Sequence, residues 1–183
     1  MRTSEADILI VPGLNGSGPD HWQSRWESKL STARRIEQAD WDRPVLAQWI
    51  ENIAAAVREA TRPVLIVGHS LGVHAVAHAV PLLEPGKVRG AFLVTPPSAD
   101  RLGEIADIDR AFLPIPTAPL SFPSLLVASR NDPFAEYRQT EDLAWAWGSV
   151  IVDAGEAGHI NAESGHGPWP EGLMSFGGFL AKI

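Results

Sequence analysis

The sequence predicts an α/β fold in which helices cover both faces of a mostly parallel sheet of about six strands. Short uninterrupted runs of aliphatic residues alternate with longer segments of helical periodicity along the 183 residues. Such runs are typical of strands buried on both faces, and their alternation with helices is typical of βαβ units. With 45% hydrophobic and 20% charged residues, the chain has the composition of a globular protein with a full core. We therefore expect one domain over residues 1–183.

The expected strands are aliphatic runs that end at Gly, Pro, Ser or Asp, where a strand gives way to a turn. A sixth, weaker strand is placed at Arg34–Gln38 by the rhythm of the chain more than by its composition. The five stronger strands are Ile8–Val11, Val64–Val67, Ala91–Val94, Leu125–Ala128 and Val150–Val152.

The expected helices lie between these strands and after the last one. The first helix carries one apolar stripe, with Trp22, Trp26 and Leu30 four residues apart. The second helix follows Pro44, a residue that suits the start of a helix, and repeats its apolar residues at helical spacing. The full set is Asp20–Leu30, Val45–Ala60, Leu71–Leu83, Phe134–Trp147 and Trp169–Leu180.

The segment Thr95–Pro123 interrupts the alternation. It contains six prolines and has room for only a short helix near Leu102–Phe112. Long irregular segments inside a compact domain are uncommon and are often lids or binding loops. Because it follows a strand, we expect a lid-like insert at 95–123 that overhangs the carboxyl edge of the sheet.

Composition excludes several classes of function. The net charge of −7, the absence of a Lys/Arg cluster and the pI of about 5.3 argue against a nucleic-acid partner. With no cysteine, disulfides, thiolate metal sites and a cysteine nucleophile are excluded. The N-terminal apolar run is far shorter than the roughly 20 residues of a membrane span. We expect a cytoplasmic monomer that does not bind a membrane.

The motif Gly68-His69-Ser70-Leu71-Gly72 directly follows an expected strand and precedes an expected helix. This G-x-S-x-G pattern, in that strand–turn–helix context, is typical of a nucleophile elbow, a sharp turn that exposes a serine hydroxyl. Glycines on either side of the serine allow helix and strand to cross closely. An ordinary turn that happens to contain a serine is the alternative. We expect Ser70 to be a nucleophile.

A serine nucleophile needs a base, and six histidines are available. His74 and His78 are one helical turn apart but lack the other ligands of a metal site. His69 lies inside the elbow, and His21 opens the first helix. His159 and His166 both follow the last strand. We favour His159 because its loop, DAGEAGHIN, is nearer the strand end and so holds a side chain more rigidly.

The base in turn needs a carboxylate that fixes its tautomer. Asp132 follows the fifth strand, at the same expected sheet edge as Ser70 and His159. Its alternative role is to cap the next helix, ahead of Pro133. Asp153, at the end of the last strand, is the second candidate. The order Ser, Asp, His along the chain is that of a known class of serine enzymes with a parallel sheet.

Acyl transfer also requires N–H donors for the oxyanion. The Leu71 N–H follows from the elbow, at a helix N-terminus. The second donor is expected in the glycine-rich loop VPGLNGSGPDHW, from either Leu14 or Asn15. This loop lacks the patterns of nucleotide-binding loops. Trp22, which follows the loop, is expected with the 95–123 insert at the wall of the substrate pocket, and His69 is expected beside the substrate.

These residues together resemble small α/β-hydrolases of the retinoblastoma-binding-protein-nine and YdeN type. The likeness covers nearly the whole chain and includes PGLNGSGPDHWQSRWE, GHSLG, SRNDP and GHINAESGHGPWPEG. The last segment is its most specific part and supports His159 over His166. The resemblance implies a reduced α/β-hydrolase fold with strand order 2-1-3-4-5-6. It also implies serine hydrolysis of small esters or amides without a cofactor. Lacking cysteine, the chain cannot carry a Leu-x-Cys-x-Glu motif for binding retinoblastoma protein.

The expected function is therefore hydrolysis of a small-molecule ester, thioester or amide through an acyl-enzyme on Ser70, with neither metal nor cofactor. Two alternatives remain open at this stage. One is an aminopeptidase-type amide hydrolase, which a comparison of amide and ester substrates with the same acyl group would separate. The other is a non-catalytic binding protein on the hydrolase fold, which would have no need of a complete Ser-Asp-His set.

Overall fold

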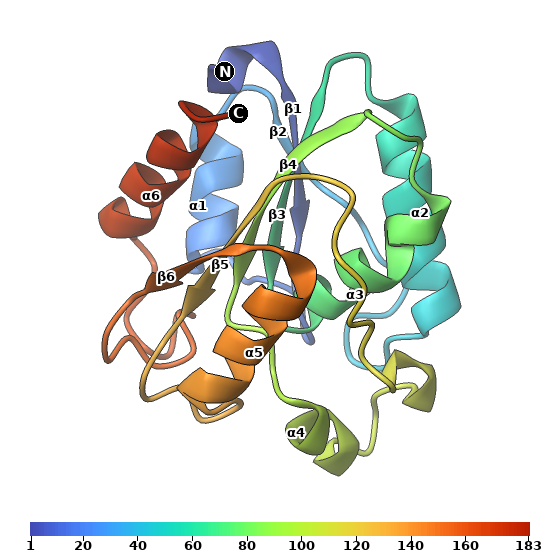
Figure 1. Cartoon of the computed structure of the whole chain (residues 1–183), viewed down its shortest axis with the longest axis vertical. Coiled ribbons are helices and arrows are strands. Elements are labelled where there is room, and N and C mark those ends of the chain that lie inside the picture. Colours follow the sequence, from blue (N-terminus) through green and yellow to red (C-terminus); the bar gives the residue numbers. More distant parts are fainter.

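The computed structural model describes all 183 residues and contains one six-stranded sheet (Figure 1). The strand order is β2-β1-β3-β4-β5-β6, as the resemblance implied, and every neighbouring pair is parallel. All carboxyl ends therefore meet at one edge. The strands are β1 (Asp7–Val11), β2 (Ala33–Arg35), β3 (Val64–His69), β4 (Val88–Val94), β5 (Ser124–Ala128) and β6 (Val150–Asp153).

The helices form a layer on each face of the sheet. In Figure 1, α1 and α6 lie together on one side, and α2 and α3 lie on the other. The α5 helix packs with α2 and α3, because its Ala144 and Trp147 belong to their hydrophobic cluster. The bounds are α1 (Trp22–Lys29), α2 (Leu46–Glu59), α3 (Leu71–Ala79), α4 (Ala99–Glu104), α5 (Tyr137–Trp147) and α6 (Pro170–Leu180).

Strand side chains alternate between two separate hydrophobic cores, as the two-residue period of a strand requires. In β1, Ile8 and Ile10 pack under α1 and α6, whereas Leu9 and Val11 pack under α2 and α3. Every residue of β3 is buried, which accounts for its uninterrupted aliphatic sequence. The core under α1 and α6 is rich in aromatic side chains, among them Trp22 and Trp26, whose ring centroids lie 4.8 Å apart.

Several element boundaries differ from the sequence-based expectation. The second strand is Ala33–Arg35, earlier than the expected 34–38. The α3 helix ends at Ala79 and continues as a short 3₁₀ turn containing Pro81, since proline cannot continue an α-helical ladder. The α5 helix begins at Tyr137, three residues later than expected, because Glu136 and Gln139 form a capping box there.

The 95–123 insert contains two short helices where one was expected. These are α4 and a 3₁₀ turn, Arg110–Phe112. Side chains from the body of the fold donate to three main-chain oxygens of the insert. His74 Nε2 donates to Pro97 O at 2.7 Å, His78 Nε2 to Phe112 O at 3.1 Å, and Trp147 Nε1 to Pro116 O at 2.7 Å. The two histidines considered as a metal pair thus tie α3 to the insert.

The α3 helix crosses closely over the end of β1. A Cβ on Gly72 would lie 2.4 Å from the main-chain oxygens of both Val11 and Pro12. A Cβ on Gly68 would meet its neighbours at 3.4 Å or more, which is ordinary contact. The steric requirement expected of both motif glycines therefore applies at Gly72. None of the helices has the length and apolar character needed to cross a bilayer.

We expect Gly72→Ala to lower the free energy of unfolding by about 2 to 4 kcal/mol, because the added methyl group would force the helix away from the strand. Denaturant unfolding measures this. The matched control is Gly177→Ala, in α6, where a Cβ meets nothing within 4 Å. Alanine there should raise the free energy of unfolding by at most about 1 kcal/mol. Equal stability of the two variants would contradict the assigned crossing.

Candidate active site

Ser70 stands at the carboxyl edge of the sheet, between the end of β3 and the first residue of α3. Its backbone has φ 53° and ψ −127°, a conformation that a residue with a side chain rarely adopts. The strain is local to the turn that reverses the chain from strand into helix. It holds the Ser70 hydroxyl out at the sheet edge, where residues following β5 and β6 converge.

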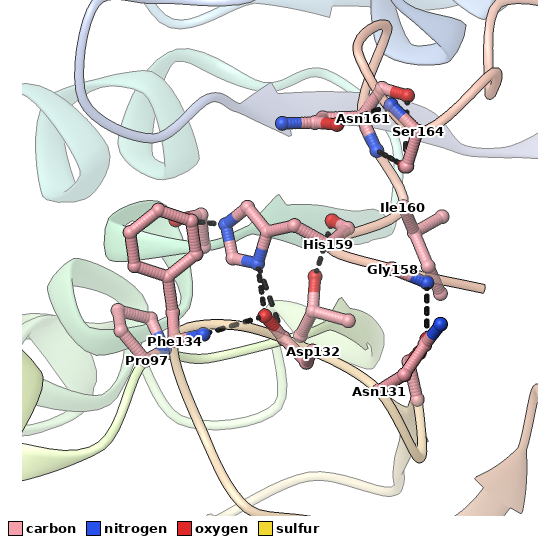
Figure 2. Close-up of polar contacts among 12 residues, drawn as sticks. Pro97, Asn131, Asp132, Phe134, Gly158, His159, Ile160, Asn161 and Ser164 are labelled. Carbon is pink, nitrogen blue, oxygen red and sulfur yellow. Dashed lines mark hydrogen bonds and ion pairs between the residues drawn. The ribbon is translucent and has the colours of Figure 1, made fainter. Parts of the chain in front are cut away.

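The structure joins Ser70, His159 and Asp132 by hydrogen bonds. Ser70 Oγ lies 2.9 Å from His159 Nε2. On the other side of the ring, His159 Nδ1 lies 2.9 and 3.1 Å from the two carboxylate oxygens of Asp132 (Figure 2). Because a carboxylate can only accept, Nδ1 carries the proton and Nε2 presents a lone pair to the serine hydroxyl. This tautomer can take the proton of Ser70.

Asp132 does not cap the α5 helix, which begins five residues later with Glu136 as its N-cap. Its Oδ1 instead accepts from the Phe134 N–H at 2.9 Å, closing a local turn. The same carboxylate therefore serves the turn and His159 in one conformation, whereas the sequence suggested a choice between a cap and an acid. Figure 2 shows both bonds, with the Phe134 ring beside His159.

The competing acid and base candidates lie elsewhere. Asp153 pairs with Arg130, whose Nε donates at 2.8 Å, and its other oxygen accepts from the Gly155 N–H. His166 Nδ1 is 3.1 Å from the Ser164 hydroxyl, in the segment that precedes α6. Neither side chain is hydrogen-bonded to the Ser70–His159–Asp132 set.

A cavity of about 420 Å³ opens beside Ser70 and His159, a size typical of small-molecule sites. Its two walls differ in chemistry. The insert and the β5 loop provide an apolar wall of Pro97, Leu102, Ile105, Ile108 and Phe134. The first loop and the segment after His159 provide a more polar wall that includes Asn15, His21, Asn161 and Glu163.

The structure separates the two candidates for the second oxyanion donor. The Asn15 N–H donates to Trp41 O at 2.8 Å and is not free. The Leu14 N–H makes no hydrogen bond within the protein, and Leu14 lines the cavity with Leu71. Gly13 brings this loop against the elbow, since a Cβ there would lie 3.2 Å from Leu71 N. Leu71 begins α3, so its N–H has no partner one turn earlier in the helix.

The two residues expected beside the substrate have different positions. His69 lines the cavity, although it is almost fully buried. Trp22 is completely buried and does not line the cavity, so its expected place at the pocket wall is wrong. Its indole packs in the aromatic core against Trp26 and Trp169, and Nε1 donates to Ile160 O at 2.8 Å. An apolar stripe favours burial, and here burial decides the position.

Burial keeps three other histidines neutral. It lowers the pKa of His21 to about 4, with help from the positive charge of Arg35. It lowers the pKa of His74 to about 4 and that of His69 well below its ordinary value. His21 Nδ1 accepts from the Gln23 N–H, so its proton lies on Nε2. These rings act as hydrogen-bonding and packing groups through the neutral pH range.

Sequence reasoning missed residues that hold the His159 loop. Asn131 Oδ1 accepts from the Gly158 N–H at 2.7 Å, and Ser129 Oγ from the Ala157 N–H at 3.0 Å. Thr95 Oγ1 donates to His159 O at 3.1 Å. Asn131 and Ser129 fall in the quoted SRNDP segment, but nothing in a linear pattern indicates that their side chains bind a loop 26 or more residues away.

Both a family model and a solved structure match most of this chain, and both are described as hydrolases. The family model described as serine hydrolase matches residues 8–177. A YdeN-like hydrolase of Pectobacterium atrosepticum is 40% identical, with 97% of this chain and 91% of that chain covered and a TM-score of 0.85. No curated protein matches the chain by sequence.

Two more distant solved structures are similar in fold alone. The ydeN gene product of Bacillus subtilis is 18% identical over 96% of this chain and 99% of that one, with a TM-score of 0.75. Esterase 2 of Thermogutta terrifontis is 19% identical over 100% of this chain and 86% of that one, with a TM-score of 0.71.

The buried neutral histidines predict a loss of stability in mild acid. Between pH 6.5 and about 4, the unfolded chain binds protons on His21 and His74 that the folded chain does not, so the free energy of unfolding falls as pH falls. Below about 4 the contribution is constant. His74→Gln, which keeps a donor for Pro97 O, should reduce this loss by roughly 2 to 3 kcal/mol. Unfolding titrations across the window measure it, and parallel pH dependence in both proteins would contradict a neutral His74.

Proposed function

The chain belongs to the serine hydrolase family, and on this premise we propose that Ser70, His159 and Asp132 form its catalytic triad. The observation that carries the proposal is the continuous hydrogen-bonded series from the Ser70 hydroxyl through His159 to the Asp132 carboxylate, at 2.9 Å on each side of the ring. A base within hydrogen-bond reach of a nucleophile, itself oriented by a third group, is the arrangement that activates a serine. We propose hydrolysis of small esters, thioesters or amides.

The reaction would run in two steps. Ser70 Oγ attacks the substrate carbonyl while His159 Nε2 takes its proton, and Asp132 stabilises the imidazolium that results. The Leu71 and Leu14 N–H groups donate to the oxyanion. His159 then gives its proton to the leaving oxygen, sulfur or nitrogen, and the acyl-enzyme forms. Water, deprotonated by His159, attacks the acyl carbonyl and releases the acid and Ser70.

The chemistry of the cavity supports a substrate with one apolar arm. Leu102, Ile105 and Ile108 of the 95–123 insert form most of the apolar wall, and we propose that the acyl group packs against them. In this proposal the insert acts as a pocket wall, supported by its bonds to α3 and Trp147. The polar wall across the cavity would face the leaving group. At about 420 Å³ the cavity suits a small molecule.

The alternatives differ in what they predict. An aminopeptidase-type enzyme would cleave the amide of a given acyl group faster, relative to its ester, than a simple esterase would. A binding protein that keeps the fold would leave both substrates intact. The free Leu14 N–H and the tautomer of His159 favour an enzyme, because binding alone requires neither.

Covalent labelling tests the proposed nucleophile. We expect a fluorophosphonate to add once to the wild-type protein and not at all to Ser70→Ala, as measured by intact mass. His159→Gln and Asp132→Asn should slow labelling by about a thousandfold or more, because the serine loses its base or the base loses its tautomer.

The matched controls are His166→Gln and Asp153→Asn, which change the same residue types at the competing positions. Both should label at close to the wild-type rate. A wild-type protein that is folded but unlabelled, or equal slowing in His166→Gln and His159→Gln, would refute the proposed triad.

The apolar wall predicts acyl-chain selectivity. Ile105→Trp fills the cavity, so kcat/KM for p-nitrophenyl hexanoate should fall by about tenfold or more while the acetate ester changes by less than about threefold. Ala106→Trp is the matched control, because Ala106 is exposed and does not line the cavity. A uniform loss for both esters in Ile105→Trp would place the acyl group elsewhere.

A further inference from the structure

We propose that His69, Thr95 and Trp22 are positioning residues that orient His159 by binding two consecutive main-chain oxygens of its loop. The inference rests on the proposed function, because it assigns these side chains a role in holding the proposed base. None of the three is needed to touch the substrate or the reacting atoms. Their role is to fix the peptide group that directly follows the His159 side chain and the next peptide group along the loop.

The first of the two oxygens, His159 O, accepts two side-chain hydrogen bonds. His69 Nε2 lies 2.9 Å from it, and Thr95 Oγ1 lies 3.1 Å from it. His69 ends β3 and Thr95 directly follows β4, the neighbouring strand in the sheet. Because a carbonyl oxygen only accepts, the His69 proton lies on Nε2, and burial keeps this ring neutral by lowering its pKa.

The second oxygen, Ile160 O, accepts from Trp22 Nε1 at 2.8 Å. Trp22 comes from the opposite end of the chain and is held in the aromatic core under α1 and α6. All five residues of this arrangement are at least nine-tenths buried: Trp22, His69, Thr95, His159 and Ile160. A buried donor or acceptor that loses its partner finds no water to replace it. Both peptide groups are therefore confined to one orientation.

Backbone strain indicates that the bonds impose this orientation. Ile160 has φ 48° and Thr95 has φ 45°. For β-branched residues the left-handed region is a genuine outlier, and it persists only where surrounding interactions over-determine it. The strain lies on the residue after His159 and on one of the residues that bind it. One strained residue thus adjoins the His159 peptide group, and the other carries a hydroxyl that binds it.

The orientation matters because His159 lies in a loop and must meet two partners at once. Its ring is bonded on one side to Ser70 and on the other to Asp132, and it is flanked by the rings of His69 and Phe134 at centroid distances of 5.0 and 4.5 Å. A small rotation of the backbone would lengthen one of these bonds. Displacements on the order of 1 Å in a catalytic group reduce rates by about a hundredfold.

The test compares variants that remove a donor with variants that restore it. Thr95→Val removes the hydroxyl while keeping the shape, and Thr95→Ser restores it. His69→Met removes the ring donor, and His69→Gln offers an amide N–H near the position of Nε2. Thr32→Val is the matched control, because Thr32 Oγ1 makes the same kind of bond to Thr3 O at 2.8 Å, away from the site.

We expect kcat for a p-nitrophenyl ester to fall by about tenfold in Thr95→Val and about a hundredfold in His69→Met, with KM unchanged. Thr95→Ser and His69→Gln should recover most of the rate, and Thr32→Val should match the wild type. The downfield proton resonance of His159 Nδ1–H should shift or broaden in step with kcat. Folded Thr95→Val and His69→Met proteins with wild-type kcat and an unchanged resonance would overturn the proposal.

The two proposals fail in different ways. If the wild-type protein neither labels nor hydrolyses esters, the proposed function fails, but the resonance of His159 still reports whether Thr95 and His69 hold the ring. An unchanged resonance in Thr95→Val and His69→Met would then refute positioning as well. If the wild-type protein is active, and Thr95→Val and His69→Met keep its kcat and its His159 resonance, positioning fails while the proposed function stands. Circular dichroism and unfolding of each variant identify any that do not fold.

Discussion

The close crossing of α3 over the end of β1 is the constraint on which the rest of the site depends. It is set by Gly72, where any side chain would strike two main-chain oxygens, and by the positive φ of Ser70. Because the helix can approach so closely, the loop after β1 passes directly beside the elbow, with Gly13 against Ser70 and Leu71. The free N–H of Leu14, the serine hydroxyl and the mouth of the cavity all follow from that approach.

Around this crossing, irregular segments are held by side chains that bind main-chain groups. His74, His78 and Trp147 bind oxygens of the 95–123 insert, and another set binds the loop of His159. Such bonds give loops the fixed geometry that secondary structure gives elsewhere, and a site built on loops requires it. They also give a reason for the burial of His69 and His74, because a neutral imidazole supplies one N–H donor without introducing a charge.

Most of the fold, and the set of residues at its carboxyl edge, could be predicted from the sequence. Aliphatic runs marked the strands of a parallel sheet, and the resemblance supplied their order. Predictions that depended on competition between alternative local structures were less accurate. The α5 helix begins at Tyr137 because a capping box forms there, and the insert contains two short helices. Trp22 was expected at the pocket wall and is in the core. An apolar stripe on a helix does not distinguish a side chain packed in the core from one that lines a pocket.

By itself the sequence determined which segments are strands and helices, and that Ser70, Asp132 and His159 follow strands, because periodicity and strand-end turns are local properties of the chain. Only the tertiary structure decided which of two histidines meets Ser70, which of two aspartates meets that histidine, and whether Leu14 or Asn15 keeps a free N–H. It also decided that Trp22, His69 and Thr95 bind one loop. These are relations between atoms distant in the chain, and packing fixes them through bonds such as that from the Asn15 N–H to Trp41 O, which no linear pattern encodes.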